Sequence, residues 1–173
     1  NLREDKHLSY GAGGFVLGAR NERPFIVYAP VQTDKTAESV SEIRKELSEF
    51  VSTRPATAAE LEKVKTNEVL KLPGQWETNA AVAGSVANMV RYDLPDDYYQ
   101  HYDANVRNLS LDDVRSVSNT VVRPADVNWF MVGDRAKIVE KLDGLGFDQI
   151  IEIDADGNPK TPALKQTEVE IKN

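Results

Sequence analysis

The chain has 173 residues, a formal net charge of -7 and no cysteine. This length suits one domain that buries a core without disulfides, and the lack of cysteine excludes thiolate metal sites, cysteine nucleophiles and disulfide frameworks. The acidic balance argues against a nucleic-acid or anionic-membrane surface, and no apolar run approaches the roughly 20 residues of a membrane span.

The first part of the chain predicts a β-hairpin. Ser9–Ala19 combines glycines with apolar residues, and Pro24–Val31 is a second β-prone stretch. The polar residues 20–23 between them have turn character. The charged segment Asn1–Lys6 has no initiator methionine and reads as the middle of an element, so we expect a processed or recombinant fragment.

Two amphipathic helices are expected after the hairpin. Asp34–Thr53 carries an apolar stripe at helical spacing, and Glu42 is among the charged residues outside that stripe. Thr57 and Glu60 have the spacing of a capping box, in which each side chain satisfies a free backbone donor. This second helix is expected to end near Pro73.

Further helices are expected in the middle of the chain. Gln75–Arg91 is poor in charge and rich in alanine, which predicts a buried helix. Shorter helices are expected to begin at Pro95 and after the cap Ser110.

The end of the chain predicts a β-α-β unit. Val127–Val132 is a nearly continuous apolar run, typical of a strand buried on both faces. A helix from Gly133 and a strand over Gln149–Ile153 would complete the unit. The tail is polar, although Val169–Ile171 could pair as an edge strand. Four strands are few for so many helices, which suggests missing strands.

Two glycine-containing loops resemble ligand sites but have simpler interpretations. Gly11–Gly14 resembles a phosphate loop, yet such a loop lies between a strand and a helix, and here a strand continues. Asp154–Asn158 resembles the start of a calcium loop, but Pro159 and Lys165 stand where that loop requires glycine and glutamate. A hairpin glycine and an Asp-Gly turn are the better interpretations.

The tyrosines and histidines carry weak signals. The tyrosine group could stack bases, but the neighbouring aspartates would repel phosphates, so core packing is favoured. Its members are Tyr92, Tyr98, Tyr99 and Tyr102. His7 and His101 are far apart and neither begins a zinc-binding helical motif.

The N-terminal cluster Arg3–Tyr10 is dense in charge and leads directly into a strand. Arginine suits planar recognition of carbonyl and carboxylate groups, and the Tyr10 hydroxyl would add a second donor. The alternative is an ordinary charged helix end with an Arg–Glu pair, and composition alone favours that alternative.

Several motifs in order resemble the insulinase/pitrilysin family of zinc peptidases, in the second, non-zinc half of the molecule. The segment Leu2–Ala12 resembles the family's L-R-E-x-K-x-x-x-Y stretch, and the resemblance continues to about residue 155. The other matching segments are Val31–Thr36, Thr57–Leu61, Leu94–Tyr99, Leu109–Val114 and Val132–Asp134. Bacterial members are the most similar.

This resemblance implies the fold and the domain boundaries. The fold would be α+β, a layer of helices on a mostly antiparallel sheet, forming half of a clam-shell metallopeptidase. Residues 1–155 would be the C-terminal peptidase domain, lacking its first strand and helix, and residues 156–173 a polar tail.

The resemblance also implies the site and the partners. Only Arg3 and Tyr10 match functional positions: in the family this pair hydrogen-bonds the substrate backbone near the scissile carbonyl. The H-x-x-E-H zinc motif is not in this chain, so zinc would be held by another domain, in the same or a separate chain. The chain would then be the substrate-binding part of a zinc-dependent endopeptidase, with peptides as substrates.

Two other functions stay open. A non-peptidase homologue could use the same fold as a structural or assembly subunit, and a free-standing acidic interaction module is a further possibility. A bacterial periplasmic or envelope location fits the resemblance, and a cytoplasmic one is compatible with it.

Overall fold

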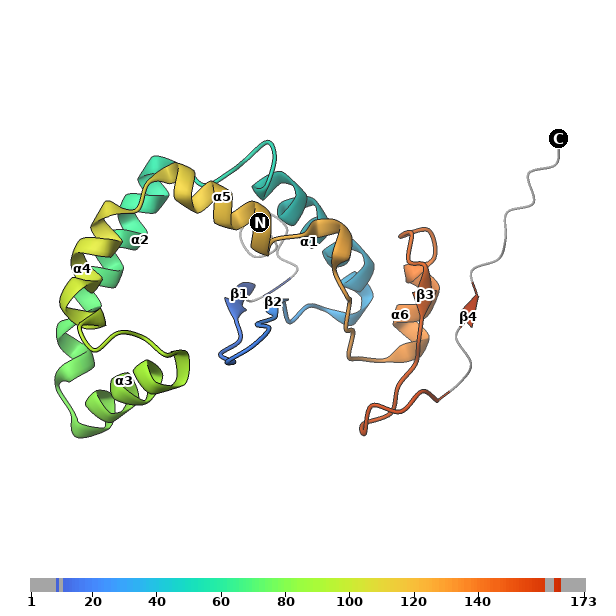
Figure 1. The fold of residues 1–173 in the computed structure, drawn as a ribbon. Helices are drawn as coiled ribbons and strands as arrows, with labels where there is room; N and C mark the ends of the chain where they lie inside the picture. The colour runs from blue at the N-terminus through green and yellow to red at the C-terminus, as the bar shows by residue number, and fades with distance from the viewer. Residues whose placement is uncertain (1–8, 10, 161–163, 166–173) are drawn as a thin grey trace.

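A computed structural model describes residues 9, 11–160 and 164–165, which form a helix-dominated fold with small antiparallel β-pairs (Figure 1). The expected α+β class is confirmed in this form. In chain order the elements are β1 (Gly13–Val16), β2 (Phe25–Tyr28), α1 (Thr36–Phe50), α2 (Ala58–Lys71), α3 (Asn79–Tyr92), α4 (Tyr98–Asn108), α5 (Leu111–Val121), α6 (Arg135–Leu142), β3 (Gln149–Ile150) and β4 (Leu164–Lys165).

The predicted hairpin is present. β1 pairs with β2 antiparallel, with Gly13 opposite Tyr28 and Val16 opposite Phe25. A separate antiparallel bridge joins Ser9 to Val31. β3 pairs with β4 in a second two-stranded sheet.

The helices α2 to α5 curve into an arch beside the hairpin (Figure 1). Capping boxes begin α2 at Thr57 and α5 at Ser110, where side chain and backbone bond reciprocally. The sequence predicted the capping box at Thr57, and it predicted Ser110 as the cap of the later helix. The arch meets the hairpin where the Arg23 guanidinium lies 5.2 Å from the centroid of the Tyr92 ring, at the end of α3.

The core lies where α1 packs against α6. Four apolar residues of the described chain are buried there and nearby: Val40, Val122, Ile138 and Leu142. Glu42 of α1, expected on the outer face, is also buried, with 7% of its surface exposed. The buried face of α1 is therefore wider than its apolar stripe and includes Glu42.

Much of the apolar surface is uncovered. The chain exposes 13292 Å², whereas a compact monomer of this mass exposes about 8,500 Å². The helix expected to be buried, α3, has Ser85 as its buried residue and exposes Val82, Val86 and Val90. Its alanine-rich composition indicated close packing, but no described element covers this valine stripe.

The predicted β-α-β unit does not form within the described chain. Val127–Val132 is extended but belongs to no ladder, and β3 is shorter than expected and pairs with β4. A strand requires a partner edge as well as an apolar sequence, and Val127–Val132 has no such edge among the described residues. The possible edge strand Val169–Ile171 lies outside the described residues.

None of the helices found in the described ranges is both long enough and apolar enough to cross a membrane.

Candidate functional site

The two residues predicted to contact substrate, Arg3 and Tyr10, lie outside the described residues, and so does His7. The described residue between them, Ser9, is buried and tied to the strand that leads to α1. Its Oγ lies 2.6 Å from the Pro30 carbonyl oxygen and 2.7 Å from that of Gly11, so its single proton can be donated to either. The Gly11 amide donates to the same Oγ at 3.1 Å.

The glycines of β1 have a packing role. A Cβ at Gly13 would lie 3.1 Å from the Tyr28 ring, and one at Gly14 would lie 3.3 Å from the Phe25 ring. Glycine therefore lets the aromatic rings of β2 lie across the neighbouring strand. β1 leads into a hairpin and not into a helix, so the phosphate-loop alternative lacks its required context.

The described residues offer no zinc site. Within those ranges no group of three or more His, Cys, Asp or Glu side chains could hold a metal ion. His101 of α4 is exposed and lies 3.2 Å from an Asp97 carboxylate oxygen. This i,i+4 pair on a helix surface supplies one nitrogen and one carboxylate, whereas catalytic zinc takes three protein ligands.

The Asp154–Asn158 segment is a turn closed by its own carboxylate. The amides of Asp156 and Asn158 donate to Asp154 Oδ1 at 2.9 and 2.8 Å. These bonds, led by that from the Asn158 backbone, lower the pKa of the Asp154 carboxyl. The carboxylate thus accepts backbone hydrogen bonds at the place where a calcium loop would present it to the ion.

Three of the four tyrosines pack with Trp76 into an aromatic cluster between α2 and α4. The Trp76 and Tyr99 rings are 4.9 Å apart in an edge-to-face arrangement, and Tyr98 and Tyr102 continue the cluster. The Tyr102 hydroxyl donates to Glu68 at 3.4 Å. Burial, and then the Glu68 charge, raise the pKa of Tyr102. The tyrosines of the cluster are half-buried and do not belong to the core, where the sequence had placed them, and Tyr92 lies apart from the cluster against Arg23.

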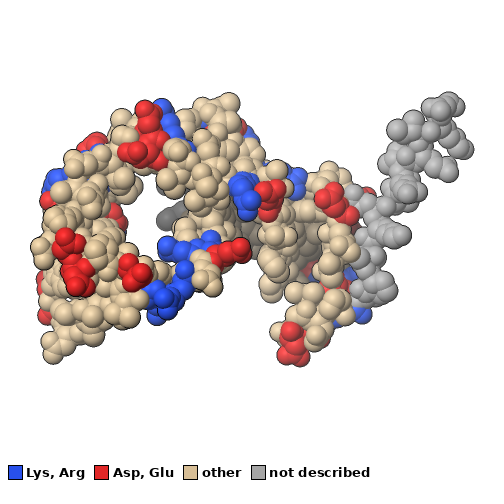
Figure 2. All heavy atoms as spheres, in the orientation of Figure 1, with Lys and Arg blue, Asp and Glu red and all other residues tan. Residues whose placement is uncertain are grey.

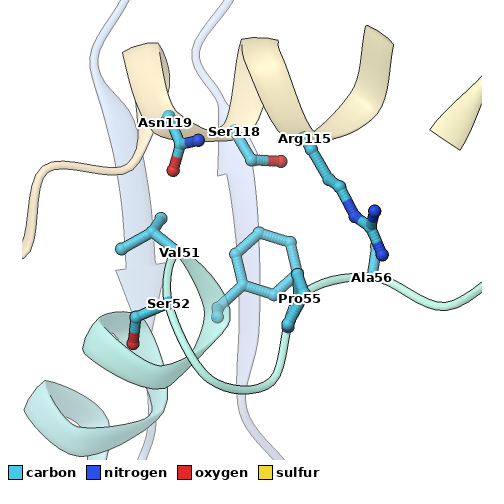
Figure 3. A pocket seen from close by; sticks show the side chains of 8 residues that line it. Val51, Ser52, Pro55, Ala56, Arg115, Ser118 and Asn119 are labelled. Carbon is cyan, nitrogen blue, oxygen red and sulfur yellow. The ribbon is translucent and has the colours of Figure 1, made fainter. Parts of the chain in front are cut away.

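A small hollow of about 360 Å³ separates the end of α1 from α5 (Figure 3). Arg115, Ser118 and Asn119 line it from α5, opposite Val51 and Pro55. The polar groups have local partners, because Ser118 Oγ donates to the Val114 carbonyl at 2.7 Å and Arg115 lies 3.7 Å from Asp112. A larger groove of about 1240 Å³ lies between β2 and Val127–Val132.

A sequence profile described as the peptidase M16 inactive domain matches residues 1–68, which include Arg3 and Tyr10. This match covers 68 of the 173 residues, so the N-terminal part of the chain resembles the peptidase M16 inactive domain. No curated protein matches the chain.

Solved structures share the fold of most of this chain. A crystal structure of a peptidase M16 inactive domain from Pseudomonas fluorescens aligns with a TM-score of 0.63 and 19% identity, over 71% of this chain and 29% of that one. A protease from Helicobacter pylori aligns with a TM-score of 0.52 and 18% identity, over 72% of this chain and 30% of that one. The chain therefore spans less than a third of either structure.

Sequence reasoning missed two features of the chain. Ser9, which holds the segment between the predicted donors against the strand before α1, has no motif of its own. The Arg44 guanidinium lies over the rings of Trp129 and Phe147. Both contacts join residues far apart in sequence, so no local pattern reveals them.

On the face shown in Figure 2, red acidic groups lie over the arch, and blue basic groups gather near the middle of the view with acidic groups beside them. The formal net charge of the whole chain is -7.

Proposed function

We propose that this chain is the substrate-binding, zinc-free half of a zinc-dependent endopeptidase. The observation that carries the proposal is the match of residues 1–68 to the M16 inactive domain, because that range contains both Arg3 and Tyr10. The chain would pair with a zinc-bearing half that carries H-x-x-E-H, in the same polypeptide or a separate one. Residues 1–155 would form the domain, and residues 156–173 a polar tail.

In this function Arg3 and Tyr10 donate hydrogen bonds to the substrate backbone near the scissile carbonyl. Negative charge develops on that carbonyl oxygen during hydrolysis, and fixed donors stabilise it. Ser9 supports the arrangement, because its bond to the Pro30 carbonyl anchors the segment beside Val31. The described residues include no group of His, Cys, Asp or Glu that could hold a metal, so the activation of the attacking water is assigned to the zinc-bearing half.

The test is steady-state kinetics of the peptidase assembled from this chain and its zinc-bearing half. Arg3→Ala and Tyr10→Phe should each lower kcat/KM by about 100- to 1,000-fold, if each donor acts like one in an oxyanion hole. Zinc content should stay unchanged. The matched controls Arg20→Ala and Tyr28→Phe alter exposed residues of the same types and should leave kcat/KM within about twofold.

Unchanged kinetics in both site variants, with normal assembly, would contradict the proposed role of the pair. A complete complex that cleaves no peptide would favour the alternative, a structural or assembly subunit of the same fold.

The chain by itself should bind no stoichiometric zinc and cleave no peptide. Metal analysis of the purified chain tests this directly. One tightly held zinc per chain would show that the metal site is not confined to the partner.

A further inference from the structure

The arch of helices α2 to α5 is joined to the rest of the described chain at its base and at its far end. At the base, residues 51–57 lead from α1 into α2, and Val122 leads out of α5. At the far end, Tyr92, the last residue of α3, lies against the hairpin loop, residues 17–24. In Figure 2 an opening lies between the arch and the middle of the molecule. The backbone therefore holds the arch at one end, and side chains hold it at the other.

The base of the arch has the features of a hinge. The hollow of about 360 Å³ separates the end of α1 from α5, and Val51 and Pro55, which line it, belong to the connection into α2 (Figure 3). Val122 is buried in the core and gives the other connection a fixed point. Hinges are formed by a few residues at the ends of elements where packing is sparse. The arch can therefore turn at its base without disturbing the contact between α1 and α6.

The hairpin loop contacts both the ring and the hydroxyl of Tyr92. The Arg23 guanidinium lies 5.2 Å from the Tyr92 ring centroid, and Arg23 Nε donates to the Leu17 carbonyl oxygen at 3.3 Å. The Leu17 amide donates to the Pro24 carbonyl oxygen at 3.0 Å, which closes the loop. A Cβ at Gly18 would lie 2.8 Å from the Tyr92 hydroxyl oxygen, so the ring reaches the loop because this residue is glycine.

The backbone is strained directly after Tyr92. Among the described residues other than glycine, Asp93 alone has a positive φ, 53°. Its amide and that of Leu94 donate to the Met89 carbonyl at the end of α3. Glycine is usual at such a position, and a carboxylate is unfavourable at the C-terminus of a helix. Strained residues persist where the surroundings fix the backbone, and they are common in segments that switch.

We propose that Arg23, Gly18 and Tyr92 form a latch that holds the arch closed against the hairpin. When the latch opens, the arch turns about residues 51–57 and Val122. The latch thus sets how far the valine stripe of α3 lies from the hairpin. A cation–π contact at an exposed site is weak, so both states are populated, and a ligand that binds one state better shifts the balance. This inference does not depend on the proposed role in proteolysis.

Distances between spin labels test the latch in the whole chain. The chain has no cysteine, so two introduced cysteines carry all the label. Asn21→Cys in the hairpin loop and Ala83→Cys in α3, both at exposed positions, report the separation of the loop from the arch. The control pair combines Ala83→Cys with Lys63→Cys in α2, an exposed position within the arch. Pulsed electron spin resonance gives the distribution of distances for each pair.

The pair between loop and arch should show mainly short distances in the chain with an intact latch. Tyr92→Leu and Arg23→Gln each remove the cation–π contact and should raise the ratio of long to short distances by about 3- to 30-fold. Tyr92→Phe keeps the ring, and the matched control Arg20→Gln changes another exposed arginine of the same loop. Both should leave the ratio within about twofold. The pair within the arch should be unchanged in every variant.

Gly18→Ala tests the contact from the side of the loop. The added Cβ would meet the Tyr92 hydroxyl oxygen at 2.8 Å, so this variant should also raise the ratio of long to short distances. That oxygen is absent in Tyr92→Phe, so the same substitution in that background should have a smaller effect. Circular dichroism checks that every variant keeps its helices.

Three results would overturn the inference. The first is an unchanged distribution in Tyr92→Leu, Arg23→Gln and Gly18→Ala. The second is an equal change in the pair within the arch, which would show that the helices unfold and that the arch does not turn as a unit. The third is a predominance of long distances in the chain with an intact latch, which would show that these contacts do not hold the arch.

Discussion

The guanidinium of Arg44 donates a 2.6 Å hydrogen bond to the backbone carbonyl of Leu145, a residue 101 positions later. The same guanidinium lies 5.7 Å from the Trp129 ring centroid and 5.3 Å from that of Phe147. One side chain of α1 therefore holds both the Val127–Val132 segment and the loop after α6. The described part of the chain buries four apolar residues, so this contact is important in fixing the C-terminal elements against α1.

Arg44→Ala should lower the free energy of unfolding by about 2–3 kcal/mol, because it removes a charge-assisted hydrogen bond and two cation–π contacts. Denaturant unfolding measures this loss. The control Arg115→Ala removes an exposed arginine whose ion pair with Asp112 spans 3.7 Å, and should cost at most about 1 kcal/mol. Equal losses in the two variants would show that Arg44 does not fasten the C-terminal elements.

Two glycines on either side of Leu145 shape the loop that presents its carbonyl. Gly144 and Gly146 have φ values of 81° and 71°, a conformation that residues with a Cβ adopt at a cost. Gly144→Ala should therefore lower the free energy of unfolding by about 1–2 kcal/mol. Thermal unfolding followed by circular dichroism measures the change.

Gly84→Ala is the matched control with the opposite sign. Gly84 lies inside α3, and a Cβ there would meet nothing within 4 Å. Alanine in a helix interior is more stable than glycine by about 0.5–1 kcal/mol, so this variant should gain stability. A loss of stability in Gly84→Ala, or no loss in Gly144→Ala, would contradict the backbone conformations assigned to these two glycines.

Local signals in the sequence predicted the helices well. Thr57 with Glu60, and Ser110, place the starts of α2 and α5, because a cap depends on residues within four positions of each other. The hairpin was predictable for the same reason, since two β-prone stretches are joined by a short polar turn. The role proposed for Arg3 and Tyr10 rests on a family resemblance, which likewise consists of short motifs in a fixed order.

The features that the sequence did not predict depend on contacts between residues distant in sequence. Val127–Val132 has the composition of a buried central strand, yet burial requires neighbours on both sides, and composition does not supply them. Glu42 was assigned to the solvent face by charge alone but is buried. The anchoring of Ser9 beside Val31 depends on a chain reversal, so no pattern around Ser9 could indicate it.

Glu68 should control the ionisation of Tyr102. Burial comes first among the causes that raise the pKa of the Tyr102 hydroxyl, and the neighbouring Glu68 carboxylate follows. In Glu68→Gln the pKa of Tyr102 should fall towards its ordinary value of about 10. Ultraviolet absorbance of tyrosinate, titrated at high pH, measures the shift.

The control Glu62→Gln removes another carboxylate of α2, which pairs with Lys65 at 3.1 Å, and should leave that titration unchanged. Because the folded pKa of Tyr102 is raised, its contribution to stability is complete below the unfolded pKa. It is lost as the pH rises through the folded pKa. Glu68→Gln should therefore weaken the loss of stability between neutral and high pH, and an unaltered loss would exclude this pair as a cause.

The capping box of α5 should make stability depend on acid pH. The Ser110 hydroxyl and amide donate to Asp113 Oδ2 at 2.6 and 2.9 Å, and these bonds lower the pKa of the Asp113 carboxyl. A lowered folded pKa means that the stabilisation is complete above the unfolded pKa, which is about 3.9. It is then lost as the pH falls through the lower, folded value.

Unfolding free energies of wild type and Asp113→Asn, measured from pH 6 downwards, should therefore converge below about pH 4. The control Asp148→Asn changes an exposed carboxylate in the loop before β3. The difference in unfolding free energy between this control and wild type should not shrink in the same way as the pH falls. A difference at Asp113 that stays constant down to the lowest pH would mean that the carboxylate form is not what caps α5.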